Sequence, residues 1–460
     1  MCLSERMESS NESLSVPTLK PFTPQEAKDI IQSLNHPAVF SNMVSDWPAL
    51  HWKTSFLSCV LEEVLLRFRI GRKKTSTDPQ FETQCEYVHG TLKQFDDWVC
   101  GLSPDITSPF SRYDISEFWV YADYKYLAEV FKDKSDLLQD IVWADFGFPG
   151  RDGQESTIWI GSTGANTPCH LDTYGCNLVL QVEGRKTWYL FPPENTAHLY
   201  PTRIPYEESS IFSKVNIVNP DSTRFPLFSG ACPHVVTLHP GQVLFVPRHW
   251  WHYVECVDEA TVSVNTWIEL DADHEARVEE AITRMLVFTF KSSESSSQEW
   301  LNPTEEQLTT HHTNLQYLNS AVSAYMECHS RTLDKVDVSK QDREIKKRRT
   351  HSDIILSSTA DPPFGEHLMP VLSKPSGKGF ESTAPSNAAT DSQQQSHRSE
   401  ESPCSQQTLC IPQREPSALG ADSKPSKRTI SSDEVLDCLV NPQVMHLVAE
   451  LLLQKQATKA

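Results

Sequence analysis

The chain has 460 residues, more than one ordinary domain requires, and its formal net charge of −20 gives a pI near 5.3. This acidic balance argues against nucleic acid as the main ligand, because a phosphate backbone attracts basic side chains. Twelve cysteines without a C-x-x-C pair, and no apolar run of about 18 residues, predict no zinc ribbon, no disulfide framework and no membrane span.

Residues 1–18 are rich in Ser, Glu and Asn, and we expect them to be disordered. They lack the apolar core of a signal peptide, and the scattered cysteines suit a reducing compartment. The chain is therefore expected in the cytoplasm, with the nucleus as the alternative. A basic run at Lys346–Arg349 is weak evidence for nuclear import, because such runs are usually just solvated. Ordered structure is expected to begin with a helix over Pro24–Ile31.

The strongest chemical signal is Thr167-Pro-Cys-His170-Leu-Asp172, followed far downstream by His252. Alternate side chains of an extended strand face the same side, so His170 and Asp172 can bind one metal together. Two histidines and a carboxylate hold Fe(II) on one face and leave positions open for O₂ and a co-substrate. The H-x-D pattern is weak by itself, because His351-Ser-Asp353 repeats it in a segment expected to be disordered.

The residues after Asp172 predict a hairpin. An apolar run over Asn177–Val182 and an aromatic-rich run over Lys186–Phe191 flank a glycine turn, and two prolines stop the second strand. Lys186 opens that second strand, where its ammonium can lie beside the metal and pair with a carboxylate of a dianionic co-substrate. A solvated turn lysine is the alternative, and the preceding H-x-D pattern favours the first interpretation.

A second pair of strands is predicted at Gln242–Val246, after a Pro-Gly turn, and at Ala260–Leu270, where apolar and polar residues alternate. His249 competes with His252 as the third ligand, and the two tryptophans directly before His252 favour His252. Asn177 and Asn265 lie on predicted core strands. Their buried amides need partners, which a co-substrate carboxylate, a metal ligand or the backbone could supply.

Several motifs in this order resemble a JmjC domain, and more narrowly the small JmjC-only hydroxylases. The motifs are Thr167–Asp172, Gly184–Trp188 with Leu190–Pro193, Pro240–Pro247, Trp250–His252 and Val264–Trp267, with further likeness at Pro37–Phe40, Asp46–Ala49 and Trp119–Tyr124. Residues 19–290 are therefore expected to form a JmjC catalytic region with a helical N-terminal part. The loop Thr173–Cys176 is one residue longer than in the asparaginyl hydroxylase of this group, which leaves the substrate open.

The resemblance implies a mainly β fold, a double-stranded β-helix or jelly-roll barrel of the cupin-like kind with flanking helices and a disordered C-terminal tail. It also implies Fe(II), with 2-oxoglutarate as co-substrate. The catalytic iron ligands of the family match His170, Asp172 and His252. The residues that bind or surround its co-substrate match Lys186, Thr167, Tyr121, Asn177 and Asn265.

The function implied by the resemblance is hydroxylation of a protein side chain. Three alternatives stay open: an adaptor or regulator of a small heat-shock protein in the stress response with little catalysis, an RNA hydroxylase, and a histone demethylase. An RNA hydroxylase would need a basic surface, and a demethylase would usually carry chromatin-reading modules, which we do not find in the sequence. The expected partner is therefore a protein, either a substrate or a small heat-shock protein, and neither a membrane nor nucleic acid.

After the catalytic region we expect a helical segment over 291–330. Apolar residues recur at helical spacing from 275 to 290, and Thr304–Gln307 forms a capping-box pattern in front of Leu308. Such a stripe most often packs against its own barrel. The alternative is a homodimer formed through the helices of 275–326, as in the resembled hydroxylases.

The composition of residues 331–430 shifts to Ser, Pro, Gln, Lys and Asp with few aromatics, which predicts a disordered linker. Residues 431–460 return to apolar periodicity and predict short amphipathic helices, over Ser431–Val440 and Val444–Leu453. Helices at the end of a tether suit a partner-binding element, or they dock on the barrel.

Overall fold

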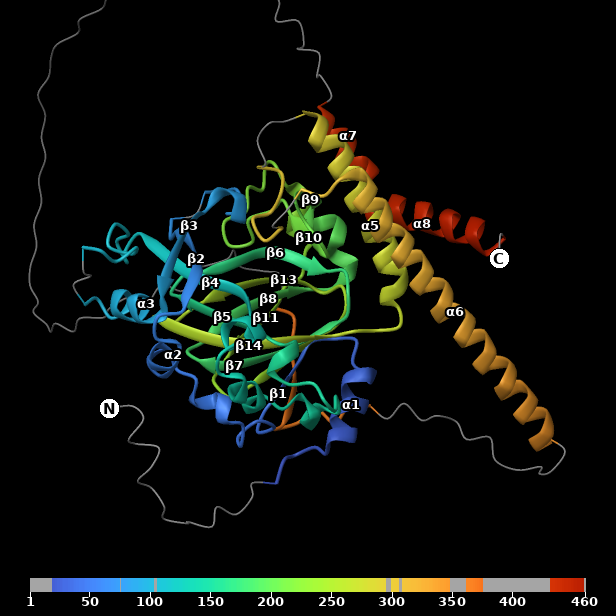
Figure 1. The fold of residues 1–460 in the computed structure, drawn as a ribbon, viewed down its shortest axis with the longest axis horizontal. Coiled ribbons are helices and arrows are strands. Elements are labelled where there is room, and N and C mark those ends of the chain that lie inside the picture. The colour runs from blue at the N-terminus through green and yellow to red at the C-terminus, as the bar shows by residue number, and fades with distance from the viewer. Residues whose placement is uncertain are drawn as a thin grey trace, which may run out of the picture.

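The computed structural model describes residues 19–74, 76–102, 106–294, 299–305, 308–347, 361–374 and 431–458, with the backbone alone for 293–294 and 331–347. Two antiparallel sheets face each other, and helices flank them (Figure 1). This is the mainly β, cupin-like double-stranded β-helix that the sequence predicted. The disorder expected for residues 1–18 and the H-x-D repeat at 351–353 lie outside the described residues.

The larger sheet has nine strands in the order β15-β1-β12-β7-β14-β5-β4-β2-β3. Their bounds are β1 Ala38–Phe40, β2 Leu65–Arg72, β3 Glu86–Thr91, β4 Phe118–Tyr126, β5 Thr157–Ser162, β7 Cys176–Glu183, β12 Val243–Val246, β14 Ala260–Ile268 and β15 Leu368–Pro370. The smaller sheet has six strands in the order β11-β8-β13-β6-β10-β9. Their bounds are β6 Asn166–Asp172, β8 Lys186–Phe191, β9 Pro201–Glu207, β10 Ser210–Ser213, β11 His234–Leu238 and β13 Trp251–Cys256.

Strand β7 shows why the sequence folds this way. Its apolar run is buried on both faces, because the N-terminal helices pack on one face and the smaller sheet lies opposite the other. Leu178 and Leu180 enter the largest core cluster, while Asn177 and Val179 line a cavity with residues of the smaller sheet. One strand therefore contributes alternately to the core and to the site.

The predicted hairpin between β7 and β8 is wrong, although both strands exist. β7 pairs with β12 and β14 in the larger sheet, whereas β8 pairs with β11 and β13 in the smaller one. The chain crosses between the sheets at Gly184, whose φ of 60° favours glycine. A Cβ there would lie 2.3 Å from the Ala260 carbonyl oxygen, so a side chain at this position would block the crossing.

Four short helices precede the site: α1 Pro24–Ser33, α2 Thr54–Leu61, α3 Leu92–Val99 and α4 Leu127–Val130. The helix expected from Pro24 is confirmed, and Thr23 and Glu26 form a capping box at its start. Apolar residues of α1, α2 and α3 belong to the same core cluster as β7, so these helices cover the outer face of the larger sheet.

The C-terminal helices are α5 Asp273–Glu294, α6 His311–Lys347, α7 Ser432–Leu439 and α8 Pro442–Ala457. The predicted stripe on α5 is buried within the chain, where Val278 and Ile282 pack with Leu318 of α6 and Met445 of α8. A homodimer through these helices stays a prediction. Helix α6 begins at His311 rather than at Leu308, after a Thr310 hydroxyl that accepts the Thr313 amide. Gln307 of the predicted capping box lies outside the described residues.

The linker predicted over 331–430 is partly ordered. Helix α6 continues to Lys347, and β15 pairs with β1 at the edge of the larger sheet. Residues 361–374 also reach the smaller sheet, because Ser373 forms a bridge to His234 of β11. The end of the basic run 346–349, and residues 350–360 and 375–430, lie outside the described residues.

Among the described residues, no single helix is long and apolar enough to cross a membrane. The pair α7 and α8, bent by 55°, passes that test together by length and composition only.

Candidate metal centre

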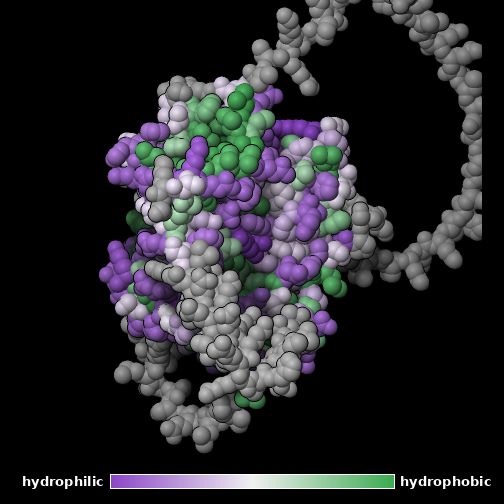
Figure 2. Space-filling model, turned by 90° about the vertical axis from the view of Figure 1, so that its right-hand side faces the viewer, coloured by the Kyte–Doolittle hydropathy of each residue, from purple (hydrophilic) through white to green (hydrophobic). Residues whose placement is uncertain are grey.

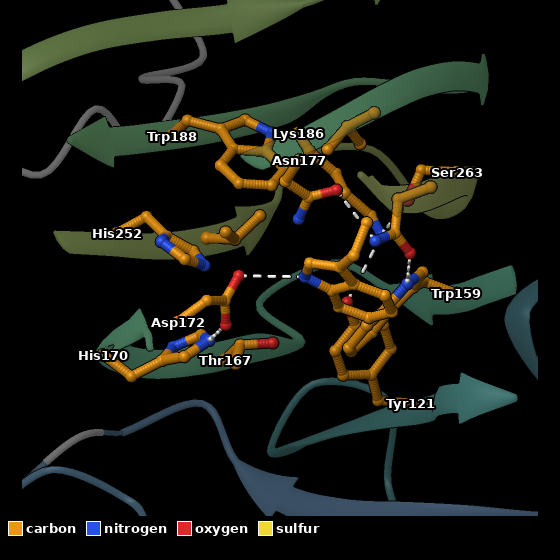
Figure 3. A pocket seen from close by; sticks show the side chains of 14 residues that line it. Tyr121, Trp159, Thr167, His170, Asp172, Asn177, Lys186, Trp188, His252 and Ser263 are labelled. Atoms are coloured by element: carbon orange, nitrogen blue, oxygen red, sulfur yellow. Dashed lines mark hydrogen bonds and ion pairs between the residues drawn. The ribbon is translucent and has the colours of Figure 1, made fainter. Parts of the chain in front are cut away.

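The three predicted metal ligands come together on the inner face of the smaller sheet. His170 and Asp172 lie two residues apart on β6, and His252 of β13 is the direct cross-strand partner of His170. The two imidazole ring centroids are 4.2 Å apart, and His170 Nε2 lies 3.6 Å from Asp172 Oδ1. One ligand atom from each residue lies within 4.8 Å of the others, so a single metal ion fits between them (Figure 3).

Both histidines are held in the tautomer that a metal needs. The Nδ1 of His170 lies 2.9 Å from the Pro168 carbonyl oxygen, and the Nδ1 of His252 lies 3.0 Å from the Trp250 carbonyl oxygen. Because a carbonyl only accepts hydrogen bonds, each Nδ1 carries the proton. Each Nε2 therefore keeps a lone pair for a metal ion.

The pocket also keeps His170 neutral. Burial, reinforced by the neighbouring His252, lowers the pKa of His170 to about 4. A neutral imidazole can donate its lone pair to a cation, whereas an imidazolium cannot.

Asp172 is oriented by a residue that the sequence analysis did not place in the site. The indole Nε1–H of Trp267 donates to Asp172 Oδ2 over 2.9 Å, which leaves Oδ1 on the side of His170. Trp267 lies on β14, two residues after the predicted site residue Asn265. This spacing could have predicted Trp267 as a site residue, because residues i and i+2 of a strand share a face.

Lys186 is a buried cation in the same cavity. Its side chain is 1% exposed, and Nζ donates to Ser263 Oγ at 2.7 Å and to the Tyr121 hydroxyl at 3.3 Å. No carboxylate in the described part of the chain pairs with it, and burial lowers its pKa. An ammonium buried with neutral partners alone is costly, so an anionic ligand fits this position. Ser263 is a second residue that the sequence analysis missed.

The two predicted amides lie opposite the metal ligands, on the larger sheet. The Asn265 oxygen accepts from Trp159 Nε1 at 2.8 Å, and its nitrogen donates to Asn177 Oδ1 at 2.9 Å. Their partners are therefore side chains rather than the backbone. The Asn177 oxygen is occupied by this bond, and its amide nitrogen points toward the metal ligands (Figure 3).

The inner cavity encloses about 420 Å³ between the two sheets. Its lining includes all eight predicted site residues, namely Tyr121, Thr167, His170, Asp172, Asn177, Lys186, His252 and Asn265. His249, the competing ligand, lies outside this lining, and its Nε2 faces the Thr173 carbonyl oxygen at 3.3 Å. The cavity therefore combines a set of metal-binding side chains with a separate buried cation.

Comparisons with known proteins also indicate a cupin-like fold. The family described as cupin-like domain matches residues 24–274. The chain is 50% identical to HSPB1-associated protein 1 of Rattus norvegicus over 462 residues, which cover 95% of this chain and 94% of that protein. It is 51% identical to HSPB1-associated protein 1 of Homo sapiens, with 95% and 94% covered. A shorter match, 37% identical over 150 residues, is to lysine-specific demethylase 8 of Xenopus tropicalis, with 31% and 32% covered.

Proposed function

The chain belongs to the cupin-like, JmjC-type family, and on that premise we propose that it is an Fe(II)- and 2-oxoglutarate-dependent oxygenase that hydroxylates a protein side chain. The observation that carries this proposal is the meeting of two features in one cavity. A facial His170–Asp172–His252 set lies beside a buried Lys186 that has no carboxylate partner in the described part of the chain.

Bound Fe(II) would supply the oxidation, in which one atom of O₂ enters the substrate hydroxyl and the other enters succinate as 2-oxoglutarate releases CO₂. The chain positions the reactants. Nε2 of both histidines and one oxygen of Asp172 would hold the metal, and Trp267 fixes the second oxygen of that carboxylate. Lys186 would pair with the carboxylate of 2-oxoglutarate that lies farther from the metal.

The neutral groups around Lys186 complete the co-substrate site. The Tyr121 and Ser263 hydroxyls contact the ammonium and would turn toward an incoming carboxylate, which accepts hydrogen bonds from both. Asn177 presents amide hydrogens to the cavity, so it would donate to an oxygen of the co-substrate or of a metal-bound water. The cavity is lined by Val179, Trp188 and Val254 as well, and these apolar walls exclude water from the reacting centre.

Anaerobic titration of the full-length chain with Mn(II), then with 2-oxoglutarate, tests the proposal without turnover. We expect one metal ion per chain and 2-oxoglutarate binding that requires the metal. His170→Ala and Asp172→Ala should lose most of the metal affinity, whereas His249→Ala, a histidine outside the cavity, should keep it. Unchanged metal binding in Asp172→Ala would overturn the assignment. With Fe(II) and O₂, the wild-type chain should release succinate and His170→Ala should not.

A second candidate function rests on the names of the relatives. They are named for association with HSPB1, and the alignment extends over 95% of this chain, beyond the cupin-like domain. We therefore propose a small heat-shock protein as a partner, which the chain either hydroxylates or regulates as an adaptor. Lysine demethylation is less well supported, because two demethylase matches cover 31% and 50% of this chain at 37% and 29% identity.

We also propose that the chain works in a reducing compartment, the cytoplasm or the nucleus. Three cysteines in the described ranges, Cys169, Cys176 and Cys256, are buried as thiols, which suits such a compartment.

A further inference from the structure

A second cavity adjoins the candidate metal centre and opens beyond it. It encloses about 970 Å³ and shares Trp159, Thr167, His170, Asp172 and Trp267 with the inner cavity. If the inner cavity holds 2-oxoglutarate beside Lys186, a side chain that enters the outer cavity meets the metal ligands at its floor. The residues that line this outer cavity therefore indicate which kind of substrate side chain it can bind.

The outer cavity is acidic beyond its metal ligand. Five further carboxylates line it, against one arginine: Glu82, Glu207, Glu208, Glu269 and Asp273, with Arg277. Three of the five lie within ion-pair distance of an arginine. Glu269 pairs with Arg151, Glu208 lies 3.8 Å from Arg284, and Asp273 lies 3.6 Å from Arg248. Arg277 stacks its guanidinium 4.5 Å from the Tyr174 ring centroid.

The remaining two carboxylates, Glu82 and Glu207, form no ion pair within the described part of the chain. Glu207 accepts hydrogen bonds from Asn302 Nδ2 at 3.0 Å and Thr304 Oγ1 at 3.2 Å, and Glu82 accepts one from the Tyr87 hydroxyl at 3.3 Å. All three donors are neutral, so hydrogen bonds orient these two carboxyl groups without an ion pair.

The charges of Arg69 and Lys125 lower the pKa of Glu82, but both cations form their ion pairs with Asp123. Arg69 donates its Nε–H to Asp123 at 2.6 Å, and Lys125 lies 3.9 Å from the same carboxylate. Burial and the charge of Asp123 raise the pKa of Glu82 to about 7, and burial with the charge of Glu82 raises the pKa of Glu207. Because Glu82 raises the pKa of Glu207, a cation placed between these carboxyl groups would favour the ionised form of both.

Aromatic rings form the other walls of this cavity. The ring centroid of Tyr124 lies 5.7 Å from that of Trp159 and 5.6 Å from that of Trp267, with interplanar angles of 87° and 43°. The three rings therefore present faces and edges from strands β4, β5 and β14 around one volume. Aromatic faces attract guanidinium and ammonium groups and pack well against their methylene stems. Trp267 also donates to Asp172, so this aromatic box ends at the metal centre.

We propose that the outer cavity binds a cationic side chain, arginine or lysine, of the protein substrate, with Glu82 and Glu207 pairing with its charge and Tyr124, Trp159 and Trp267 enclosing its stem. This inference rests on the proposed function, because the metal centre forms the floor of the cavity. It accounts for two carboxyl groups without an ion pair in the described part of the chain beside an aromatic box, which a neutral asparagine or an acidic substrate would leave without a cation.

Binding of model peptides to the full-length chain, loaded with Mn(II) and 2-oxoglutarate without O₂, tests the inference independently of turnover. The probes are capped pentapeptides Gly-Gly-X-Gly-Gly in which X is arginine, lysine, citrulline or norleucine. Citrulline keeps the shape of arginine and norleucine the stem of lysine, and both lack the charge. We expect an arginine or lysine probe to bind about tenfold more tightly than its neutral counterpart. Paramagnetic Mn(II) should broaden the NMR signals of its side-chain methylene protons.

The variants Glu82→Gln and Glu207→Gln keep shape and hydrogen-bonding capacity but remove one charge each, so either should abolish most of the preference for the charged probe. Glu129→Gln makes the same charge change at an exposed position on α4 and should leave the preference intact. Their Mn(II) and 2-oxoglutarate affinities should match the wild type, which verifies folding.

Two outcomes would overturn the inference, and they differ in what else they overturn. Equal affinity for charged and neutral probes, with normal Mn(II) and 2-oxoglutarate binding, would refute the cationic substrate and leave the proposed oxygenase standing. Failure of the wild-type chain to bind Mn(II) and 2-oxoglutarate would refute the proposed function, and the inference with it.

Discussion

Lys186 combines a full charge with almost complete burial, so one substitution can measure its contribution to 2-oxoglutarate binding. Lys186→Met keeps most of the volume and removes the ammonium. We expect Mn(II) affinity to be preserved and 2-oxoglutarate affinity to fall by about 1.5–3 kcal/mol, the worth of a hydrogen bond to a charged group. Calorimetric titration of the Mn(II)-loaded chain gives both affinities.

Ser263→Ala is the matched control for Lys186, because it removes a neighbour of the ammonium and leaves the charge. Its effect on 2-oxoglutarate binding should be clearly smaller. Equal losses of metal and 2-oxoglutarate affinity in Lys186→Met would instead point to a structural role for the lysine.

Glu82 should make the stability of the metal-free chain depend on pH. Its folded-state pKa of about 7 lies above its ordinary value of 4.5. Below that ordinary value the carboxyl is protonated in both states, so no cost of burying a charge arises. As the pH rises toward 7, the unfolded chain releases the proton first and the free energy of unfolding falls. Glu82→Gln cannot ionise, so it should be more stable than the wild type by about 1–3 kcal/mol at pH 8 and by little at pH 4.5.

Urea unfolding of both proteins in the presence of a chelator, at the two pH values, measures this difference. A gain of the same size at both pH values would show that Glu82 carries no uncompensated charge. A stabilising substitution that also weakens binding of a cationic probe is the pattern expected of a functional residue.

Single residues also mark the limit of prediction from sequence. The spacing of His170 and Asp172 predicted their shared face, because the strand period is two. The pairing of His252 with His170 is a matter of strand register between segments 82 residues apart (252 − 170), which no local pattern encodes. His252 itself was predicted from the two tryptophans before it, and the resemblance to JmjC domains implied the same residue.

At the scale of elements, β14 carries three successive inward side chains, and the sequence analysis recognised one of them. Ser263, Asn265 and Trp267 all line the inner cavity, contacting Lys186, Asn177 and Asp172 in turn. Trp267→Phe should weaken Mn(II) binding by about 10- to 100-fold, because it keeps the ring and removes the donor that orients a ligand. Metal affinity equal to wild type in this variant would make Trp267 a packing residue only. Spectroscopic Mn(II) titration measures the change.

Strand β15 was missed because composition was averaged over a long polar segment. Within residues 331–430, the apolar stretch from Leu368 to Leu372 is too short to alter that average. It is nevertheless enough for one strand, since β1 offers an open sheet edge for pairing. Leu368 is fully buried in the same core cluster as β7.

Leu368→Ala should therefore destabilise the whole barrel. Removal of a fully buried leucine side chain typically costs about 2–5 kcal/mol. Leu372→Ala is the control, because Leu372 is 71% exposed and its loss should cost less than about 0.5 kcal/mol. Chemical denaturation followed by tryptophan fluorescence compares the two, and equal small effects would mean that β15 is not part of the cooperative fold.

At the scale of the whole molecule, the C-terminal helices return to the barrel across a long intervening segment. Asp433 of α7 pairs with Lys291 of α5, and Asp437 pairs with Lys214 beyond β10. Met445 and Ala449 of α8 are buried against α5. The prediction of short helices at 431–460 is thus met in the structure, and of its two interpretations the docked one describes their contacts.

Docking leaves a second side of these helices uncovered. Figure 2 shows an apolar patch at the upper end of the face that carries α7 and α8. The exposed apolar residues of these helices are Val435, Val444, Leu447, Val448 and Leu451, which are between 38% and 54% exposed. A helix with one buried and one exposed apolar stripe suits the adaptor alternative, in which a partner covers the exposed stripe.

Two kinds of substitution distinguish an enzyme from an adaptor in cells. Truncation before 361 would remove β15, so the test uses substitutions instead. In Leu447→Glu with Leu451→Glu the exposed stripe becomes charged, whereas His170→Ala removes a metal ligand. Gln443→Glu, on the exposed surface of the same helix, is the charge control. Partners recovered with each protein are analysed by mass spectrometry for peptides that gain the mass of one oxygen atom.

If the chain is a hydroxylase, oxygen-bearing partner peptides should depend on His170, and the stripe variant should lower their yield without abolishing them. If it is an adaptor, the stripe variant should lose the partner and His170→Ala should change nothing. We expect the first pattern, because binding alone gives no physical reason for three converging metal ligands beside an uncompensated lysine. Partner association that needs the stripe, with no modification that depends on His170, would decide for the adaptor.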